Sequence, residues 1–119
     1  MTTNITNLLI MTHFNRVIIT GSLTRDPDYR HLPNGTAVTD LNLVINERRK
    51  GPDGQWTEET TFIDVTVWGR LAEIVAEYSR KGTLVLVEGR LKLDTWTTDG
   101  QKRSKIKVIG ENVQVLDKQ

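Results

Sequence analysis

The residues of this chain best suited to binding chemistry are aromatic rings set among polar side chains. In the run TFIDVTVW at positions 61–68 the residue types alternate, and successive side chains of a β-strand face opposite sides of the sheet. Phe62, Asp64, Thr66 and Trp68 therefore share one polar, exposed face, and the aliphatic side chains of the run form the other. Two rings among small polar groups suit stacking against nucleobases, because every base offers a π-face.

Two further tryptophans extend this pattern. Trp96 has the parity of Glu88 and Lys92, so it lies on the polar side of the strand predicted at 83–93 if that strand continues to it. Trp56 lies in a polar segment and is a fourth candidate ring. The alternative is that the rings hold a protein partner, because aromatic residues are enriched at protein interfaces.

Basic residues are clustered locally, although the net charge of the 119-residue chain is only +1. One cluster is Arg48-Arg49-Lys50, and the other is KRSKIK at 102–107. Local patches matter more than the summed charge for binding a polyanion. The alternative is that both runs are solvated loop charges.

The composition and the motifs disfavour several other classes of protein. Hydrophobic residues make up 37% and charged residues 26% of the chain, as in a soluble, single-domain globular protein. There is no cysteine, and the two histidines have no metal-ligand spacing. No apolar run approaches the roughly 18 residues of a membrane helix, and no phosphate-loop or nucleophile motif occurs. We therefore expect no enzyme activity, no cofactor, no metal and no membrane association.

Five strands and one helix are predicted to position these side chains. Alternating residue types predict strands at 13–23, 38–46, 60–69, 83–93 and 104–116. Between the third and fourth strands an apolar stripe predicts a short helix with its stripe in the core, formed by Leu71, Ile74, Val75 and Tyr78. We expect a turn at 25–28 and polar hairpin loops at 47–58 and 94–102.

This order of elements predicts an all-β OB-fold, a five-stranded Greek-key barrel with one short helix between strands three and four. Gly89 is expected to mark a bulge or bend, as small barrels need at their corners. Residues 1–12 are expected to be a disordered N-terminal extension, with Met11 as an alternative start, and 13–119 the folded domain. A barrel with exposed edge strands must protect them, and joining first-strand edges between subunits would do so.

The order and spacing of seven short motifs resemble the bacterial single-stranded DNA-binding proteins. The motifs are NRVIITGSL at 15–23, RDPDYR at 25–30, PNG at 33–35, WGRLAE at 68–73, YSRKG at 78–82, VEGRL at 87–91 and WTTDG at 96–100. The likeness runs from about residue 14 to 116. It implies an OB-fold that assembles as a homotetramer and protects single-stranded DNA in replication, recombination and repair, in the bacterial cytoplasm and associated with the nucleoid.

The resemblance also implies roles for particular residues. The family's stacking rings fall on Phe62, Trp68 and Trp96. Its phosphate-contacting basic residues would include Arg16, Arg30, Arg70, Lys81 and Lys92. We add Arg48, Arg49 and Lys50 because of their position in a hairpin. The chain then binds tightly, in a salt-sensitive and sequence-tolerant way.

Three features depart from this expectation. Arg49 stands where the family often has another stacking tryptophan, so that contact is absent or replaced by a guanidinium plane, and Trp56 could compensate. Asp64 is unusual on a face for a polyanion, and we expect it to pair with a nearby arginine. The family typically ends in a Gly/Pro/Gln-rich linker and an acidic, Phe-terminated tip that recruits enzymes, whereas this chain ends in LDKQ at 116–119.

The missing tip leaves alternatives open. The chain is a trimmed protein, a tail-less relative, or a plasmid or phage version, and we do not expect it to recruit replication and repair enzymes through a tail. The alternative function is a tail-less OB-fold scaffold of a primosome or replisome, whose aromatic face mainly binds a protein partner.

Overall fold

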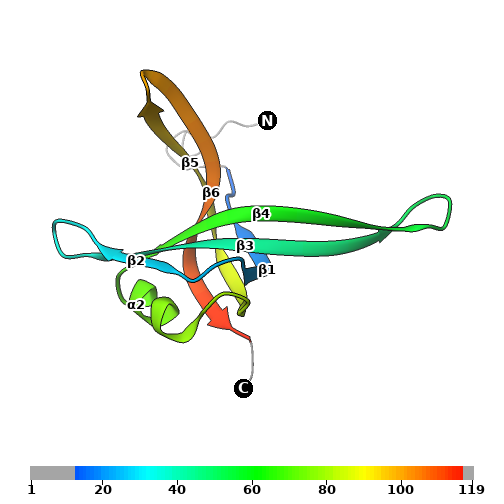
Figure 1. Ribbon diagram of the computed structural model, residues 1–119, viewed down its shortest axis with the longest axis horizontal. Helices are drawn as coiled ribbons and strands as arrows, with labels where there is room; N and C mark the ends of the chain where they lie inside the picture. Colours follow the sequence, from blue (N-terminus) through cyan, green and yellow to red (C-terminus); the bar gives the residue numbers. More distant parts are fainter. Residues whose placement is uncertain (1–12, 117–119) are drawn as a thin grey trace, which may run out of the picture.

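The computed structural model describes residues 13–116 (Figure 1). The elements in chain order are β1 (Val17–Leu23), β2 (Asp28–His31), β3 (Ala37–Lys50), β4 (Trp56–Trp68), α2 (Gly69–Tyr78), β5 (Leu84–Thr98) and β6 (Gln101–Val115). The predicted N-terminal extension, 1–12, lies outside the described residues, and so do the last three positions, 117–119.

Five of the strands close into a barrel. The order is β1-β5-β6-β4-β3, and β1 returns to β3 through the pair Ser22–Val44 and the next pair along. All neighbours are antiparallel except β4 and β6, which run parallel with Val65 opposite Val108. This confirms the predicted all-β OB-fold, with α2 between the third and fourth strands of the barrel.

The short strand β2 was not predicted. It pairs with β3 from Asp28–Asp40 to His31–Ala37, at the edge of the sheet. The local sequence carries a turn signal, Arg25-Asp26-Pro27-Asp28. All four β2 residues are exposed, so no alternation of apolar and polar side chains marks the strand. β2 exists because β3 offers backbone partners, which local sequence does not encode.

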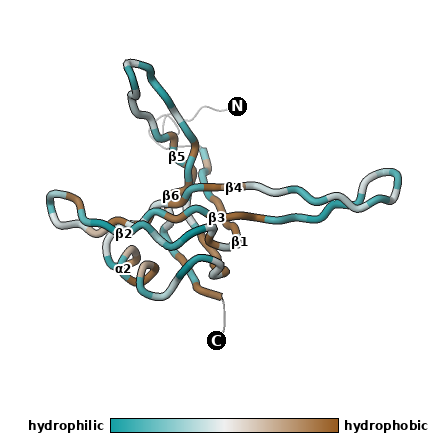
Figure 2. Tube along the Cα trace, viewed as in Figure 1, coloured by the Kyte–Doolittle hydropathy of each residue, from teal (hydrophilic) through white to brown (hydrophobic). Residues whose placement is uncertain are grey.

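The core fills the barrel with aliphatic side chains from its five strands. Its fully buried members include Leu41 and Leu43 of β3, Val65 and Val67 of β4, and several residues of the other strands. This agrees with the alternation predicted for β3 and β4. Figure 2 shows hydrophobic residues where the strands cross and hydrophilic residues along the two hairpins that leave the barrel.

The helix α2 covers one end of the barrel with a narrower face than predicted. Ala72 and Val75 are buried, and the Thr39 hydroxyl donates a hydrogen bond to the Ala72 carbonyl at 2.8 Å. Ile74 and Tyr78 are 37% and 63% exposed, so their predicted place in the core is wrong. The small Ala72 marks the buried face, and Tyr78 is the last residue of the helix. Within residues 13–116 no helix has the length and apolarity needed to cross a membrane.

The β3–β4 and β5–β6 hairpins extend beyond the barrel, and we call residues 45–61 the long arm and residues 92–107 the short arm (Figure 1). The prediction of a loop at 47–58 is wrong in extent. The β3–β4 ladder continues to the pair Lys50–Trp56, so the loop is limited to the residues between them. The loop predicted at 94–102 is likewise a paired hairpin, which turns at Asp99 and Gly100. The radius of gyration is 18.0 Å, against about 13 Å for a compact domain of 100 residues.

The short arm leaves the barrel at a bulge. The β5–β6 register shifts between Glu88 and Gly89, which confirms the predicted irregularity at Gly89. A Cβ atom at Gly89 would lie 1.9 Å from the carbonyl oxygen of Ile109. Only glycine therefore allows β5 and β6 to approach this closely at the bend.

Candidate nucleic-acid interface

Three aromatic rings lie on one exposed face of β4, which we call the aromatic face. Trp56, Phe62 and Trp68 occupy even-numbered positions, and they are 57%, 63% and 39% exposed. At about 3.3 Å per residue, neighbouring rings of this set are spaced by roughly 20 Å along the strand. The structure thus places Phe62 and Trp68 together as the alternation predicted, and adds Trp56 to the same row.

The short arm continues the aromatic face. Trp96 is 44% exposed and pairs with Arg103, and the pair Asp94–Lys105 lies two positions closer to the barrel with the same parity. The Lys105 Nζ atom lies 2.6 Å from the Asp64 Oδ2 atom, which belongs to the aromatic face of β4. This contact joins the side of the arm that carries Trp96 to the face that carries Phe62 and Trp68.

Asp64 is held in its charged form by its neighbours. Burial by itself raises the pKa of this carboxyl group, but hydrogen bonds from Lys105 and Asn42 lower it, and so do the charges of Lys105 and Arg25. The net result is a pKa below the ordinary value for aspartate. Asp64 does form an ion pair, but with a lysine rather than the arginine that the sequence suggested.

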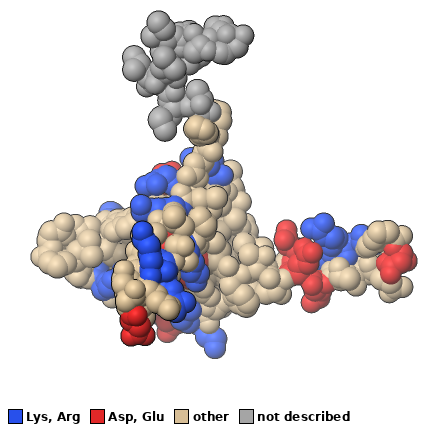
Figure 3. Space-filling view, turned by 90° about the horizontal axis from the view of Figure 1, so that it is seen from above, with Lys and Arg blue, Asp and Glu red and all other residues tan. Residues whose placement is uncertain are grey.

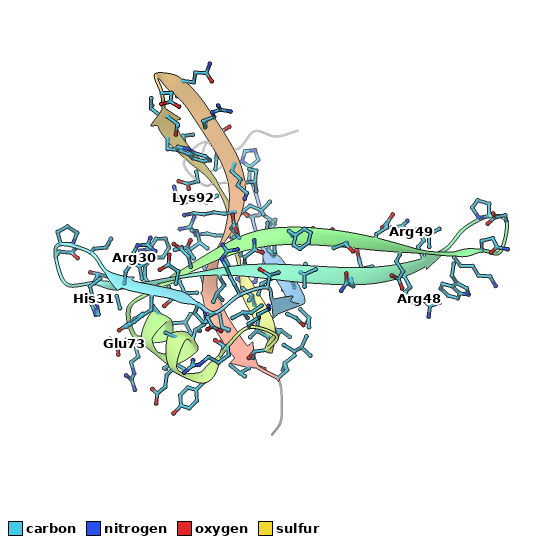
Figure 4. All side chains as sticks on the ribbon, in the orientation of Figure 1. Arg30, His31, Arg48, Arg49, Glu73 and Lys92 are labelled. Carbon is cyan, nitrogen blue, oxygen red and sulfur yellow. The ribbon has the colours of Figure 1, made fainter. Side chains whose placement is uncertain are left out.

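The two adjacent arginines of the long arm have different surroundings (Figure 4). The Arg48 guanidinium lies 5.0 Å from the ring centroid of Trp56, a cation–π contact on the aromatic face. Arg49 has the opposite parity and pairs with Glu59 at 3.3 Å. The structure therefore brings Arg48 to the rings and places Arg49 on the other side of the hairpin.

Four of the predicted phosphate contacts are already paired with carboxylates. Arg30 lies 2.5 Å from Asp40, and this hydrogen bond raises the pKa of its guanidinium despite partial burial. The other three are exposed pairs, namely Arg16 with Glu88 and Glu111, Arg49 with Glu59, and Arg70 with Glu73. Exposed ion pairs contribute about 0–1 kcal/mol, so a phosphate could compete for these cations.

The remaining predicted cations differ in position. Lys50 and Lys92 are exposed on the aromatic face and its continuation, and they form no ion pair with residues 13–116. Lys81 lies in the loop after α2, where its backbone N–H donates to Asp26 at 2.8 Å. Arg70 lies in the first turn of α2. Lys81 and Arg70 therefore come from outside the strands that carry the rings.

A groove of about 280 Å³ separates β2 from the short arm. Its walls carry both charges, and its lining includes Arg25, Arg30, Asp40, Asp64, Asp94 and Lys107. No group of three or more His, Asp or Glu side chains between residues 13 and 116 is placed to hold a metal ion. Because most of its lining side chains are charged, the groove is a polar channel beside the rings rather than an apolar pocket.

Sequence reasoning noted the basic run at 102–107 without assigning its members to a surface. Arg103 and Lys105 lie on the same side of the short arm as Trp96. Figure 3, seen from above, shows Lys and Arg side chains gathered in one stripe of the surface. The signal was present in the sequence. A two-residue turn at Asp99-Gly100 pairs 98 with 101, and counting back along the hairpin pairs Trp96 with Arg103.

Residues 14–116 match the Single-strand binding protein family. The chain belongs to this family. A relative from Wolinella succinogenes named single-stranded DNA-binding protein is 47% identical over 105 residues, which cover 87% of this chain and 65% of the relative. A relative of the same name from Aquifex aeolicus is 44% identical over 104 residues, which cover 87% of this chain and 71% of the relative.

Solved structures of family members agree in fold. The crystal structure of the wild-type single-stranded DNA binding protein from Thermus aquaticus matches with a TM-score of 0.77 and 38% identity. The match covers 87% of this chain and 50% of the Thermus chain. The Plasmodium falciparum SSB complex with ssDNA matches with a TM-score of 0.82 at 23% identity, which shows the shared fold. The match covers 91% of this chain and 99% of the Plasmodium chain. The chain thus spans about two thirds of the first relative and half of the Thermus protein.

Proposed function

We propose that this chain binds single-stranded DNA with little sequence preference. Bases stack on Phe62, Trp68, Trp96 and Trp56, and lysine and arginine side chains hold the phosphates. The observation that carries this proposal is one exposed face that unites four rings from two hairpins with basic side chains between them. Relatives within the family are named for single-stranded DNA binding, which supports the same ligand.

The energetics suit an unpaired strand. A stacked base contributes roughly 1–3 kcal/mol whatever its identity, and each phosphate contact steepens the dependence of log affinity on log salt by about 0.7. A duplex hides the faces of its bases, so it should bind weakly. We assign the phosphate contacts to Arg48, Lys50 and Lys92 first, because these cations form no ion pair with any of residues 13–116, although Glu58 is the ladder neighbour of Arg48. The other candidates are Arg16, Arg30, Arg49, Arg70 and Lys81.

The biological role that we propose follows from this binding. The chain acts by covering single strands during replication, recombination and repair, in the cytoplasm and at the nucleoid, and it acts as a binding protein rather than a catalyst. The scaffold alternative is not favoured, because the rings lie beside exposed basic side chains, as a nucleic-acid ligand requires.

We also propose that the chain forms a homotetramer through β1. One edge of β1 pairs with β5 along its length, but the other edge meets β3 only at Ser22 and Leu23. Within residues 13–116, positions 17–21 have no strand partner on that side. Ile18 there is 62% exposed. Replacing Ile18 with aspartate should shift the protein to smaller species in sedimentation equilibrium. An unchanged mass would contradict assembly through this edge.

The proposed function is tested by intrinsic fluorescence, because all three tryptophans of the chain are proposed to contact bases. We expect a single-stranded oligothymidylate to quench the emission strongly, added salt to weaken the binding, and a duplex of equal length to have little effect. Trp96→Phe and Trp68→Phe should each remove part of the quenching. No quenching at low salt would refute the proposal and favour a protein partner for the rings.

A further inference from the structure

The short arm is tied to the barrel by few backbone contacts at its base. The ladder between β4 and β6 has only the pairs Val65–Val108 and Thr66–Ile109. On the opposite edge of the arm, the ladder between β1 and β5 ends at Gly89, and the side chain of Asn15 then bonds the backbone of Leu91 at 2.7 and 2.8 Å. Beyond these points, within the part of the chain that the structure describes, the backbone groups of the arm pair only with each other. Apart from the continuity of β5 and β6 with their own ladder in the barrel, side-chain contacts therefore hold the arm in its direction.

A row of side-chain hydrogen bonds crosses from the barrel to the arm just beyond the last ladder pair. The Thr24 hydroxyl donates to Asn42 Oδ1 at 2.6 Å, and Asn42 Nδ2 donates to Asp64 Oδ1 at 2.7 Å. Lys105 Nζ, on the arm, lies 2.6 Å from the second oxygen of the same carboxylate. Both carboxylate oxygens of Asp64 are thus engaged, one by β3 and one by β6. The row runs from the end of β1 to the arm.

The position of Asp64 needs an explanation, because it puts a negative charge on the face proposed for a polyanion. It lies between Phe62 and Thr66 on β4, with its side chain 31% exposed. Its charge neutralises Lys105, a cation that could otherwise hold a phosphate. A carboxylate that only repelled the ligand would weaken binding. The contacts of Asp64 with Asn42 on β3 and Lys105 on β6 indicate a structural role instead.

We propose that Asp64 is a positioning residue, which fixes the direction of the short arm through Lys105 and so places Trp96 relative to the rings of β4. Trp96 lies two residues beyond Asp94, the ladder partner of Lys105, or about 7 Å further along the arm. A swing of the arm about its base therefore displaces Trp96 directly. The consequence for DNA rests on the proposed function, whereas the direction of the arm is a property of the free protein.

Asp94 provides a matched control. It lines the same groove as Asp64, but it pairs with Lys107 at 3.7 Å across the two strands of the arm itself. Asp94→Asn removes the same charge from the same groove and leaves the connection to the barrel intact. Asp64→Asn removes the charge and weakens the connection. Lys105→Met cuts the connection from the other side at an exposed position, which keeps the test open if Asp64→Asn fails to fold.

The free protein can be tested by spin labelling, because the chain has no cysteine of its own. Cysteines replace the exposed Thr97 on the arm and Glu77 on α2, and labelled protein is diluted with unlabelled protein so that distances within one chain dominate. We expect Asp64→Asn and Lys105→Met to broaden or shift the distance distribution, and Asp94→Asn to leave it unchanged. A distribution in Asp64→Asn that matches the wild type would overturn the proposal.

Binding of oligothymidylate supplies the second test. Complete loss of one stacked base corresponds to about a 5- to 160-fold loss of affinity, and we expect Asp64→Asn to lose at least threefold, as part of that contribution. Asp94→Asn should bind equally well or more tightly. Simple charge repulsion predicts that both variants bind more tightly, so that result would also overturn the proposal. If no variant bound DNA, the proposed function would fail, while the spin-label distances would still test the role of Asp64.

Discussion

Replacing Phe62 with alanine should weaken binding of single-stranded DNA while the protein stays folded. The ring is 63% exposed on β4, so its removal takes little from the core, and the cost in unfolding free energy should stay near 0.5 kcal/mol. The stacking contribution of one base is larger, about 1–3 kcal/mol. The dissociation constant should therefore rise between about 5- and 160-fold.

The contribution of base stacking to the loss of affinity can be distinguished from effects of charge and of side-chain bulk. Phe62 carries no charge, so the slope of log affinity against log salt should stay the same, whereas loss of one phosphate contact changes it by about 0.7. Phe62→Leu is the matched variant, because leucine keeps apolar bulk without a π-face. We expect it to lose nearly as much affinity as alanine.

The assay is a fluorescence titration with oligothymidylate at several salt concentrations, with thermal unfolding measured alongside. All three tryptophans remain in both Phe62 variants, so the signal is preserved. A folded Phe62→Ala protein that binds within twofold of the wild type would refute the reasoning. Wild-type affinity in Phe62→Leu would show that the contact is merely apolar.

Three further predictions concern charge, packing and pH. Lys92→Met should lower the salt slope by about 0.7, so that its deficit in affinity shrinks about 2.6-fold between 50 and 200 mM salt, and an unchanged slope would exclude a phosphate contact. Gly89→Ala should cost at least about 1–3 kcal/mol, seen as a fall in Tm, because its Cβ would meet the carbonyl oxygen of Ile109 at 1.9 Å. The pKa of Asp64 is lowered in the folded protein, so the pair with Lys105 stabilises the fold above the ordinary aspartate pKa of about 3.9 and is lost as pH falls through the lower, folded value. The difference in unfolding free energy between wild type and Asp64→Asn should therefore fade at acid pH, and a constant difference would contradict this.

Much of the fold follows from local sequence pattern. Alternation between apolar and polar residues identified the buried faces of β3 and β4, because a strand side chain has only two directions available. Gly89 interrupted the pattern of β5 and marked the bulge. These features depend on neighbouring residues along one strand, so a single sequence contains them.

Other features depend on partners that are distant in the chain. β2 forms on the edge of β3, and the arms stay paired beyond the barrel because each strand satisfies the backbone of the other. Polar sequence alone looks like loop in both places. Thr66 shows the same limit, since its parity predicted exposure, yet it is 3% exposed and its hydroxyl donates to Asp40.

The candidate site divides in the same way. The sequence by itself determined that Phe62 and Trp68 share a face, because both stand on one strand at a known period. Only the tertiary structure decided that Trp96 continues that face and that Asp64 bonds Lys105 across the two elements. The physical reason is that strand period orders side chains within an element, whereas the meeting of two elements depends on how the barrel closes and bends.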